Sequence, residues 1–190
     1  MNNFLDFIIM PGEAVYRLSR RCPGYTEGLV ILVLASFSII AGPVIFFELP
    51  YAISSYLITW GTLFRLLFLI SGIFILTVFY HYFAGIFGGA GDGVKLLKGL
   101  FYSMIPFCFI TPVTLILKMF EGKYTILCFF IALILLLCWS VYIQYRILNY
   151  FYGISSEKAI SVMIIPWVAG SLVVFTAFVI FLMSLVSLMV

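Results

Sequence analysis

Long apolar runs, separated by short polar or Gly- and Pro-containing stretches, dominate this sequence. A helix needs roughly 20 mostly apolar residues to cross the ~30 Å hydrocarbon core of a bilayer. Five runs meet this requirement, at residues 28–49, 63–87, 100–117, 124–145 and 159–190. Each run is expected to be helical because lipid offers no hydrogen-bond partner to an open backbone. The pattern predicts an all-α polytopic membrane protein with five transmembrane helices in one bundle. The uncharged stretch at 50–60 is expected to be a connection.

The first 27 residues form a separate, more polar arm. Pro11 suits the first position of a helix, and three apolar side chains then share one face: Ala14, Val15 and Leu18. Three arginines lie elsewhere on the same helix: Arg17, Arg20 and Arg21. The pattern predicts a short amphipathic helix on the cytoplasmic leaflet, whose arginines contact anionic lipid headgroups. A simpler alternative is that the arginines only set the topology. We divide the chain into this arm, 1–27, and a transmembrane domain, 28–190.

Composition supports the membrane interpretation. The chain is 65% hydrophobic and only 9% charged, whereas a soluble domain averages about 25% charged residues. A water-soluble fold cannot hide so much apolar surface. The net charge of +3 comes with no basic stripe, so nucleic acid is not expected as a partner.

Lysine and arginine positions predict the orientation in the membrane. Seven of the ten lie on the side of the N-terminus: Arg17, Arg20, Arg21, Lys95, Lys98, Arg146 and Lys158. The other three lie on the opposite side: Arg65, Lys118 and Lys123. This bias predicts a cytoplasmic N-terminus and an outward C-terminus. Glu48 and Arg65 flank the outer connection and could pair with each other or with lipid headgroups.

Prolines interrupt three of the predicted helices: Pro43 in the first, Pro106 and Pro112 in the third, and Pro166 in the last. Each removes one backbone hydrogen bond and favours a kink. The kinks either shape the bundle or mark hinges and broken helices that line a site. Tyrosine and tryptophan gather near the span ends, which is typical of interfacial aromatic belts: Tyr51, Tyr56, Trp60, Tyr80, Tyr82, Tyr102, Tyr124, Tyr142, Tyr145, Tyr150 and Tyr152.

Polar residues near the inner ends of the second and fourth predicted helices are the candidate site. Ionisable groups at membrane depth often mark functional sites. We expect His81, Arg146 and Asn149 to face the bundle interior and to form a polar layer that contacts a partner or ligand. At an offset of 65 residues, two stretches correspond, Tyr80, His81, Gly88 and Asp92 with Tyr145, Arg146, Gly153 and Glu157. Two readings of this offset stay open: a parallel repeat of the hairpins formed by helices two–three and four–five, or a chance correspondence in an aromatic-rich sequence.

No metal or cofactor is expected. His81 is the only histidine and has no second ligand at helical spacing. The four cysteines have no paired spacing and are expected to act as small apolar residues: Cys22, Cys108, Cys128 and Cys138. The Gly-rich stretch 88–93 lacks the third glycine of a dinucleotide fingerprint and the lysine of a P-loop. We expect a tight turn there.

Three segments give the chain a family likeness. They are Met10 to Ala14 before the first helix, His81 to Gly89 continuing through Leu100 to Pro106, and Tyr152 to Ala159 before the last helix. In order and spacing they resemble the Yip family of Ypt/Rab GTPase-interacting membrane proteins, especially its short prokaryotic branch. The resemblance implies a five-helix bundle with a cytoplasmic N-terminus, and it brings no catalytic residues. The chain lacks the long N-terminal extension of eukaryotic relatives, so we do not carry GTPase binding over to it.

The sequence therefore favours a non-enzymatic membrane scaffold or adaptor, because no nucleophile–base set is present. Its expected partners are membrane lipids and other membrane proteins or a second copy of itself, with a role in membrane organisation or trafficking. Its expected location is the cytoplasmic membrane of a prokaryote, or alternatively an endomembrane. The alternative function is a small transporter or channel subunit, which the broken helices and the repeat would suit.

Overall fold

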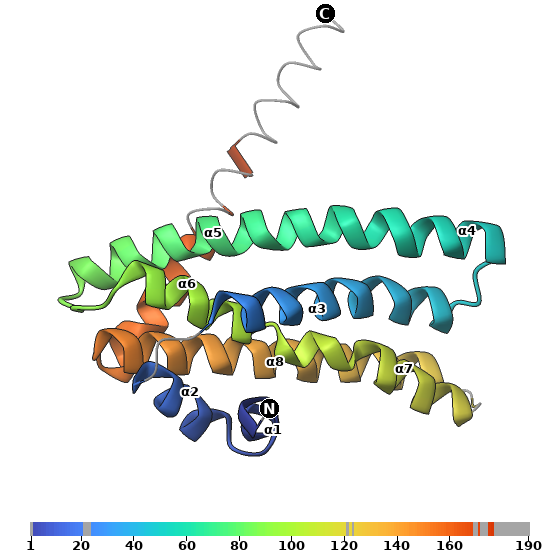
Figure 1. Ribbon diagram of the computed structural model, residues 1–190, viewed down its shortest axis with the longest axis horizontal. Coiled ribbons are helices and arrows are strands. Elements are labelled where there is room, and N and C mark those ends of the chain that lie inside the picture. Colours follow the sequence, from blue (N-terminus) through green and yellow to red (C-terminus); the bar gives the residue numbers. More distant parts are fainter. Residues whose placement is uncertain are drawn as a thin grey trace, which may run out of the picture.

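The computed structural model describes residues 2–20, 24–120, 122, 124–168, 171, 175 and 176. Every regular element in this part of the chain is helical. Four helical segments are long and apolar enough to cross a membrane: Tyr25–Phe46, Ile53–Ile86, Gly93–Met119 and Thr125–Tyr152. Figure 1 shows them running along the long axis of the molecule. The all-helical, multi-span prediction is confirmed at this level.

The first two spans are α3 (Tyr25–Phe46) and a composite helix. The composite helix consists of α4 (Tyr51–Tyr56), a π-helical turn η1 (Leu57–Gly61) and α5 (Thr62–Ile86). The prediction of a connection at 50–60 is therefore wrong beyond Pro50, which caps α4. No proline or glycine interrupts the sequence between Tyr51 and Trp60, so the helix starts at Tyr51, about three turns before the start predicted at residue 63.

The third span is broken near its middle. It consists of α6 (Gly93–Tyr102), a 3-10 segment η2 (Ile105–Phe109) and α7 (Ile110–Met119). Pro106 stands at the start of η2 and has no N–H to continue the α-helical ladder. The Ser103 carbonyl at the break accepts a hydrogen bond from Ser140 Oγ at 2.8 Å. A neighbouring helix thus satisfies the backbone group that the break frees.

The fourth span, α8 (Thr125–Tyr152), is the longest unbroken α-helix of the described chain. Residues 156–168 then form a further helix, whose residues Ala159, Val162 and Met163 are buried in the core. Pro166 lies in this helix without ending it. Most of the predicted fifth span, 159–190, lies outside the described residues.

Glycines allow the spans to pack closely, and their contacts identify residues that lie at the same level along the bundle axis. A Cβ added at Gly28 of α3 would lie 2.5 Å from Phe101 of α6, and one at Gly99 would lie 3.1 Å from Ile147 of α8. Small residues at helix interfaces allow such close approach in membranes. Phe101 and Ile147 therefore lie near the height of Gly28, in the first turn of α3. This level marks one end of the bundle, which we call the inner end after the predicted orientation.

The N-terminal arm folds back onto the bundle as two short helices, α1 (Asn2–Ile9) and α2 (Pro11–Arg20). Figure 1 shows both beside α8, on the side away from α5, and α2 packs mainly against α8. The apolar face of α2 is buried by protein, with Ala14, Val15 and Leu18 at most 7% exposed. A helix occupies this position, and its apolar side faces α8. Its placement at a lipid surface stays a prediction.

Candidate functional site

The inner end of the bundle is closed by the Gly-rich turn between α5 and α6. Gly88 adopts a left-handed conformation with φ of +82°, which glycine tolerates without a Cβ penalty. A Cβ at Gly91 would lie 2.6 Å from the Tyr152 ring, so the turn lies directly on this side chain. The stretch forms the predicted turn and packs against Tyr152 at the end of α8.

His81 belongs to this closure. Its Nδ1 lies 2.6 Å from the Tyr152 hydroxyl, and its ring is the nearest group to the position of a Cβ at Gly93. The His81 side chain therefore joins the end of α5 to the end of α8. The hydrogen bond fits an interhelical positioning role.

Arg146 lies on the face of α8 that contacts the arm, whereas Tyr152, the partner of His81, lies on another face. Its guanidinium donates to the Tyr150 hydroxyl at 2.6 Å and lies 4.8 Å from the centre of that ring. A Cβ at Gly12 of α2 would come within 2.8 Å of the same guanidinium. Among the described residues, the buried Arg146 Nε atom has no hydrogen-bond partner. This arginine thus belongs to the contact between arm and bundle.

Asn149 makes its own contact, from Nδ2 to Ser156 Oγ at 3.5 Å. The three residues of the predicted layer all lie at the inner end of the bundle, as their sequence positions require. Within the described chain, each has a different partner and no hydrogen bond joins one to another. A single shared partner-binding layer stays a prediction.

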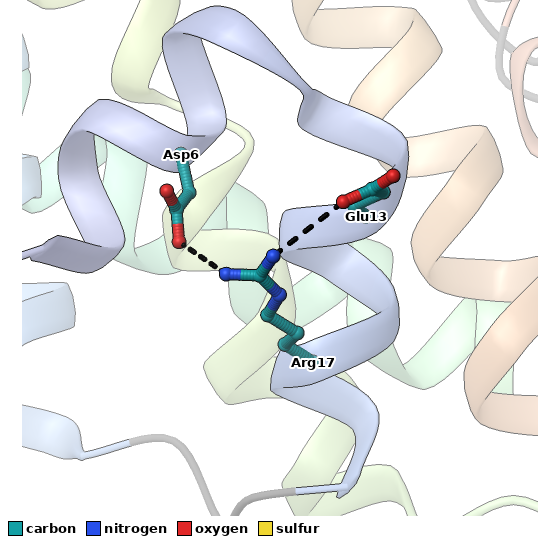
Figure 2. Close-up of polar contacts among 3 residues, drawn as sticks. All are labelled: Asp6, Glu13 and Arg17. Atoms are coloured by element: carbon teal, nitrogen blue, oxygen red, sulfur yellow. Dashed lines mark hydrogen bonds and ion pairs between the residues drawn. The ribbon is translucent and has the colours of Figure 1, made fainter.

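The arm arginines separate into two kinds. Arg17 bonds the Asp6 carboxylate at 3.0 Å and the Glu13 carboxylate at 3.5 Å, as Figure 2 shows. Arg20 forms no ion pair within the described residues; its guanidinium bonds the Tyr16 hydroxyl and lies 4.5 Å from the centre of that ring. Arg21 lies outside the described residues. The charge of Arg17 is thus neutralised within the arm, while that of Arg20 is available.

A buried polar contact that the sequence reading missed lies deeper in the bundle. The Tyr80 hydroxyl, on a fully buried side chain, donates to Gln144 Oε1 of α8 at 3.2 Å. Gln144 is the only glutamine in the sequence and interrupts an apolar run. That interruption was the available signal, because polar groups within spans seek partners on other helices.

Several tyrosines assigned to the aromatic belts are core residues instead. Tyr80, Tyr102 and Tyr152 are at most 5% exposed. Tyr102 donates to the Glu27 carboxylate at 2.6 Å and stacks on Phe7 of the arm at 5.3 Å between ring centres. Interfacial and core tyrosines look alike in sequence because both combine an apolar ring with a hydroxyl that needs a partner.

At the opposite end, Glu48 pairs with Lys118 rather than with Arg65. The Lys118 Nζ lies 2.7 Å from Glu48 Oε1, and this hydrogen bond and positive charge lower the pKa of the exposed Glu48 carboxyl. Gly61 lies against Ile40, so Arg65, one turn further along α5, lies level with the middle of α3. This depth explains why Arg65 does not reach the outer connection.

Together, the apolar helices and their interhelical contacts define a polytopic, membrane-embedded helical protein. The family model of the Yip1 domain matches residues 5–189, nearly the whole chain. The chain belongs to the Yip1 domain family. Comparison with curated proteins and with solved structures gives no match.

Proposed function

We propose that this Yip-family protein is a five-span, non-enzymatic scaffold or adaptor that acts by helix packing and by binding membrane partners. The observation that carries the proposal is that polar groups within the spans are used to join helices. Ser38 Oγ donates to the Cys108 carbonyl at 3.0 Å, linking the first and third spans. The contacts of Ser140 with Ser103 and of Tyr80 with Gln144 link the remaining spans. Such a bundle is suited to presenting fixed outer surfaces.

The outer surfaces favour lateral partners within the membrane. Large apolar side chains cover the outward face of α5, including Phe64, Phe68 and Phe74, each at least 59% exposed. Lipid accommodates such a face, and so does an apolar helix of another membrane protein or of a second copy. Lipids and membrane proteins are therefore the proposed partners. Co-purification from native membranes with mass spectrometry identifies the proteins.

The proposed topology has the N-terminus in the cytoplasm, the fifth span at 159–190 and the C-terminus outside. The orientation is supported by the sequence, which assigns seven of the ten lysines and arginines to the side of the N-terminus. In a variant with its native cysteines replaced, a cysteine at Val190 is expected to react with an impermeant thiol reagent added outside intact cells. Labelling only after the cells are opened would contradict the five-span arrangement.

A transporter or channel subunit is the second candidate, and the broken third span favours it. A transporter requires a water-accessible path through the bundle centre, whereas a scaffold does not. A cavity of about 340 Å³ near the outer end is lined by apolar side chains such as Ile40, Val44 and Leu57. In the cysteine-replaced variant, Ser38→Cys and Ser140→Cys are expected to resist a water-soluble thiol reagent. Rapid labelling of both would favour transport.

A further inference from the structure

We propose that Arg20 and Arg146, together with Tyr16 and Tyr150, form a binding site for the phosphate of an anionic phospholipid in the cytoplasmic leaflet. The site lies where α2 packs on α8. The inference extends the proposed function, because it depends on the cytoplasmic position of the arm for the choice of leaflet. The binding itself does not depend on that orientation.

The four side chains form a continuous cluster across the two elements. The rings of Tyr16 and Tyr150 meet edge to face at 5.5 Å between centres. The Arg20 guanidinium bonds the Tyr16 hydroxyl, and the Arg146 guanidinium bonds the Tyr150 hydroxyl. The two arginines thus flank a pair of packed aromatic rings, and each is oriented by one of them.

The charges of the cluster are uncompensated. Neither Arg20 nor Arg146 is in an ion pair within the described residues. The nearby carboxylates of the arm, Asp6 and Glu13, both bond Arg17. The Nε atom of Arg146 is also buried, with no acceptor in the part of the chain that the structure describes. Burying a donor of a charged group without a partner is costly, so an external anion would stabilise this arrangement.

The hydrogen-bonding capacity of the cluster fits phosphate. Arginine presents a planar fork that matches phosphate oxygens in a bidentate manner. Both tyrosine hydroxyls accept a hydrogen bond from an arginine, which leaves each O–H proton free to donate. Within the described chain, no acceptor is recorded for either proton. The guanidinium groups and hydroxyl protons of the cluster are therefore available to an external anion.

The height of the cluster fits a lipid headgroup. Arg146 immediately precedes Ile147, which lies level with the first turn of α3 through the contacts at Gly99 and Gly28. The first turn of a spanning helix lies near the boundary between hydrocarbon and headgroups. Tyr16 is 41% exposed, so the cluster opens outward from the bundle. A phosphate attached to acyl chains can reach this position from the surrounding leaflet.

The test measures lipid binding to the full-length protein in detergent by native mass spectrometry. Phosphatidylglycerol is expected to bind at least about tenfold more tightly than phosphatidylcholine. R20Q and R146Q are each expected to weaken phosphatidylglycerol binding about tenfold, the equivalent of one charge-assisted hydrogen-bonded contact of ~1.5 kcal/mol. Y150F, which keeps the ring and removes the hydroxyl, is expected to weaken it about threefold.

R17Q is the matched control, because Arg17 is in the same helix but is already paired; it is expected to change binding less than twofold. R20Q alters an exposed side chain and tests the site even if R146Q impairs folding. Equal losses for R17Q and R20Q would overturn the proposal, since they would indicate only a general charge effect. Arginine-dependent binding of inorganic phosphate without phosphatidylglycerol binding would also overturn it. Failure of the outside-labelling experiment would overturn the proposed topology, and with it the choice of leaflet, without abolishing lipid binding.

Discussion

Tyr80 illustrates how much a single residue depends on the three-dimensional arrangement. Its position near the end of a span was compatible with the membrane interface, yet its side chain is fully buried and bonds Gln144. Its neighbour Tyr82 is 65% exposed and remains suited to an aromatic belt. Two residues along a helix separate the two environments by about 200° of rotation. Rotation about the helix axis is not encoded in hydrophobicity when all faces are apolar.

Substitution of Tyr80 by phenylalanine is expected to destabilise the protein by about 0.6–1.5 kcal/mol. The change keeps the ring and removes the hydroxyl, leaving Gln144 without its recorded donor. Thermal unfolding in detergent, followed by tryptophan fluorescence, measures the effect. Tyr82→Phe serves as the control and is expected to have no measurable effect. A loss of equal size in both variants would contradict the importance of the Tyr80–Gln144 bond.

The sequence predicts where the candidate site residues lie along the bundle axis, but it does not predict which way their side chains point. Charge and hydropathy located His81, Arg146 and Asn149 near the inner end, where polar groups cost least. The side chains nevertheless turn toward Tyr152, Tyr150 and Ser156, respectively. Direct contact of Arg146 with Gly12 depends on the arm folding back onto α8. Nothing in the sequence of either segment specifies that long-range contact.

At the scale of elements, glycines mark two span ends that the apolar runs placed elsewhere. α3 begins at Tyr25, after Gly24, rather than at residue 28, and α8 continues to Tyr152, before Gly153, rather than ending at residue 145. The third span begins at Gly93 rather than at residue 100, because Asp92 caps it by accepting from the Val94 N–H at 2.9 Å. Lys95 and Lys98 lower the hydropathy of its first turns, so the apolar pattern placed the start of this span too late. Proline indicated the break in the third span, but the 3-10 geometry required the structure.

Close packing of α3 on α6 predicts a strong effect of one methyl group. Gly28→Ala would place Cβ 2.5 Å from Phe101 Cδ2 and 2.9 Å from Phe101 Cβ, and the latter atom cannot move independently of the backbone. The substitution is expected to lower the free energy of unfolding by about 1–3 kcal/mol because it overpacks the contact. Unfolding in detergent provides the measurement. Gly72→Ala is the control, because no atom lies within 4 Å of its added Cβ. A similar loss at both positions would argue against close approach at Gly28.

At the scale of the whole molecule, the two inner turns resemble each other. Gly88 follows α5 with φ of +82°, and Gly153 follows α8 with φ of +63°. Each turn is followed by a helix with an acidic residue at its start: Asp92 caps the first helix, and Glu157 lies in the first turn of the second. These turns stand 65 residues apart, at the offset that suggested the repeat. The repeat stays a prediction, but its closing glycines share one conformation.

This shared conformation gives the last prediction. A Cβ at either Gly88 or Gly153 would meet nothing within 4 Å, so substitution by alanine tests backbone strain without a steric clash. A left-handed conformation costs an ordinary residue roughly 1–2 kcal/mol. Gly88→Ala and Gly153→Ala are each expected to destabilise the protein by about this amount, whereas Gly85→Ala, also in open space but in α5, controls for the added methyl. Asparagine tolerates this conformation better, so Gly88→Asn and Gly153→Asn are expected to destabilise the protein less than the alanine substitutions. If alanine were costly at one turn and harmless at the other, the two hairpins would not close by equivalent turns.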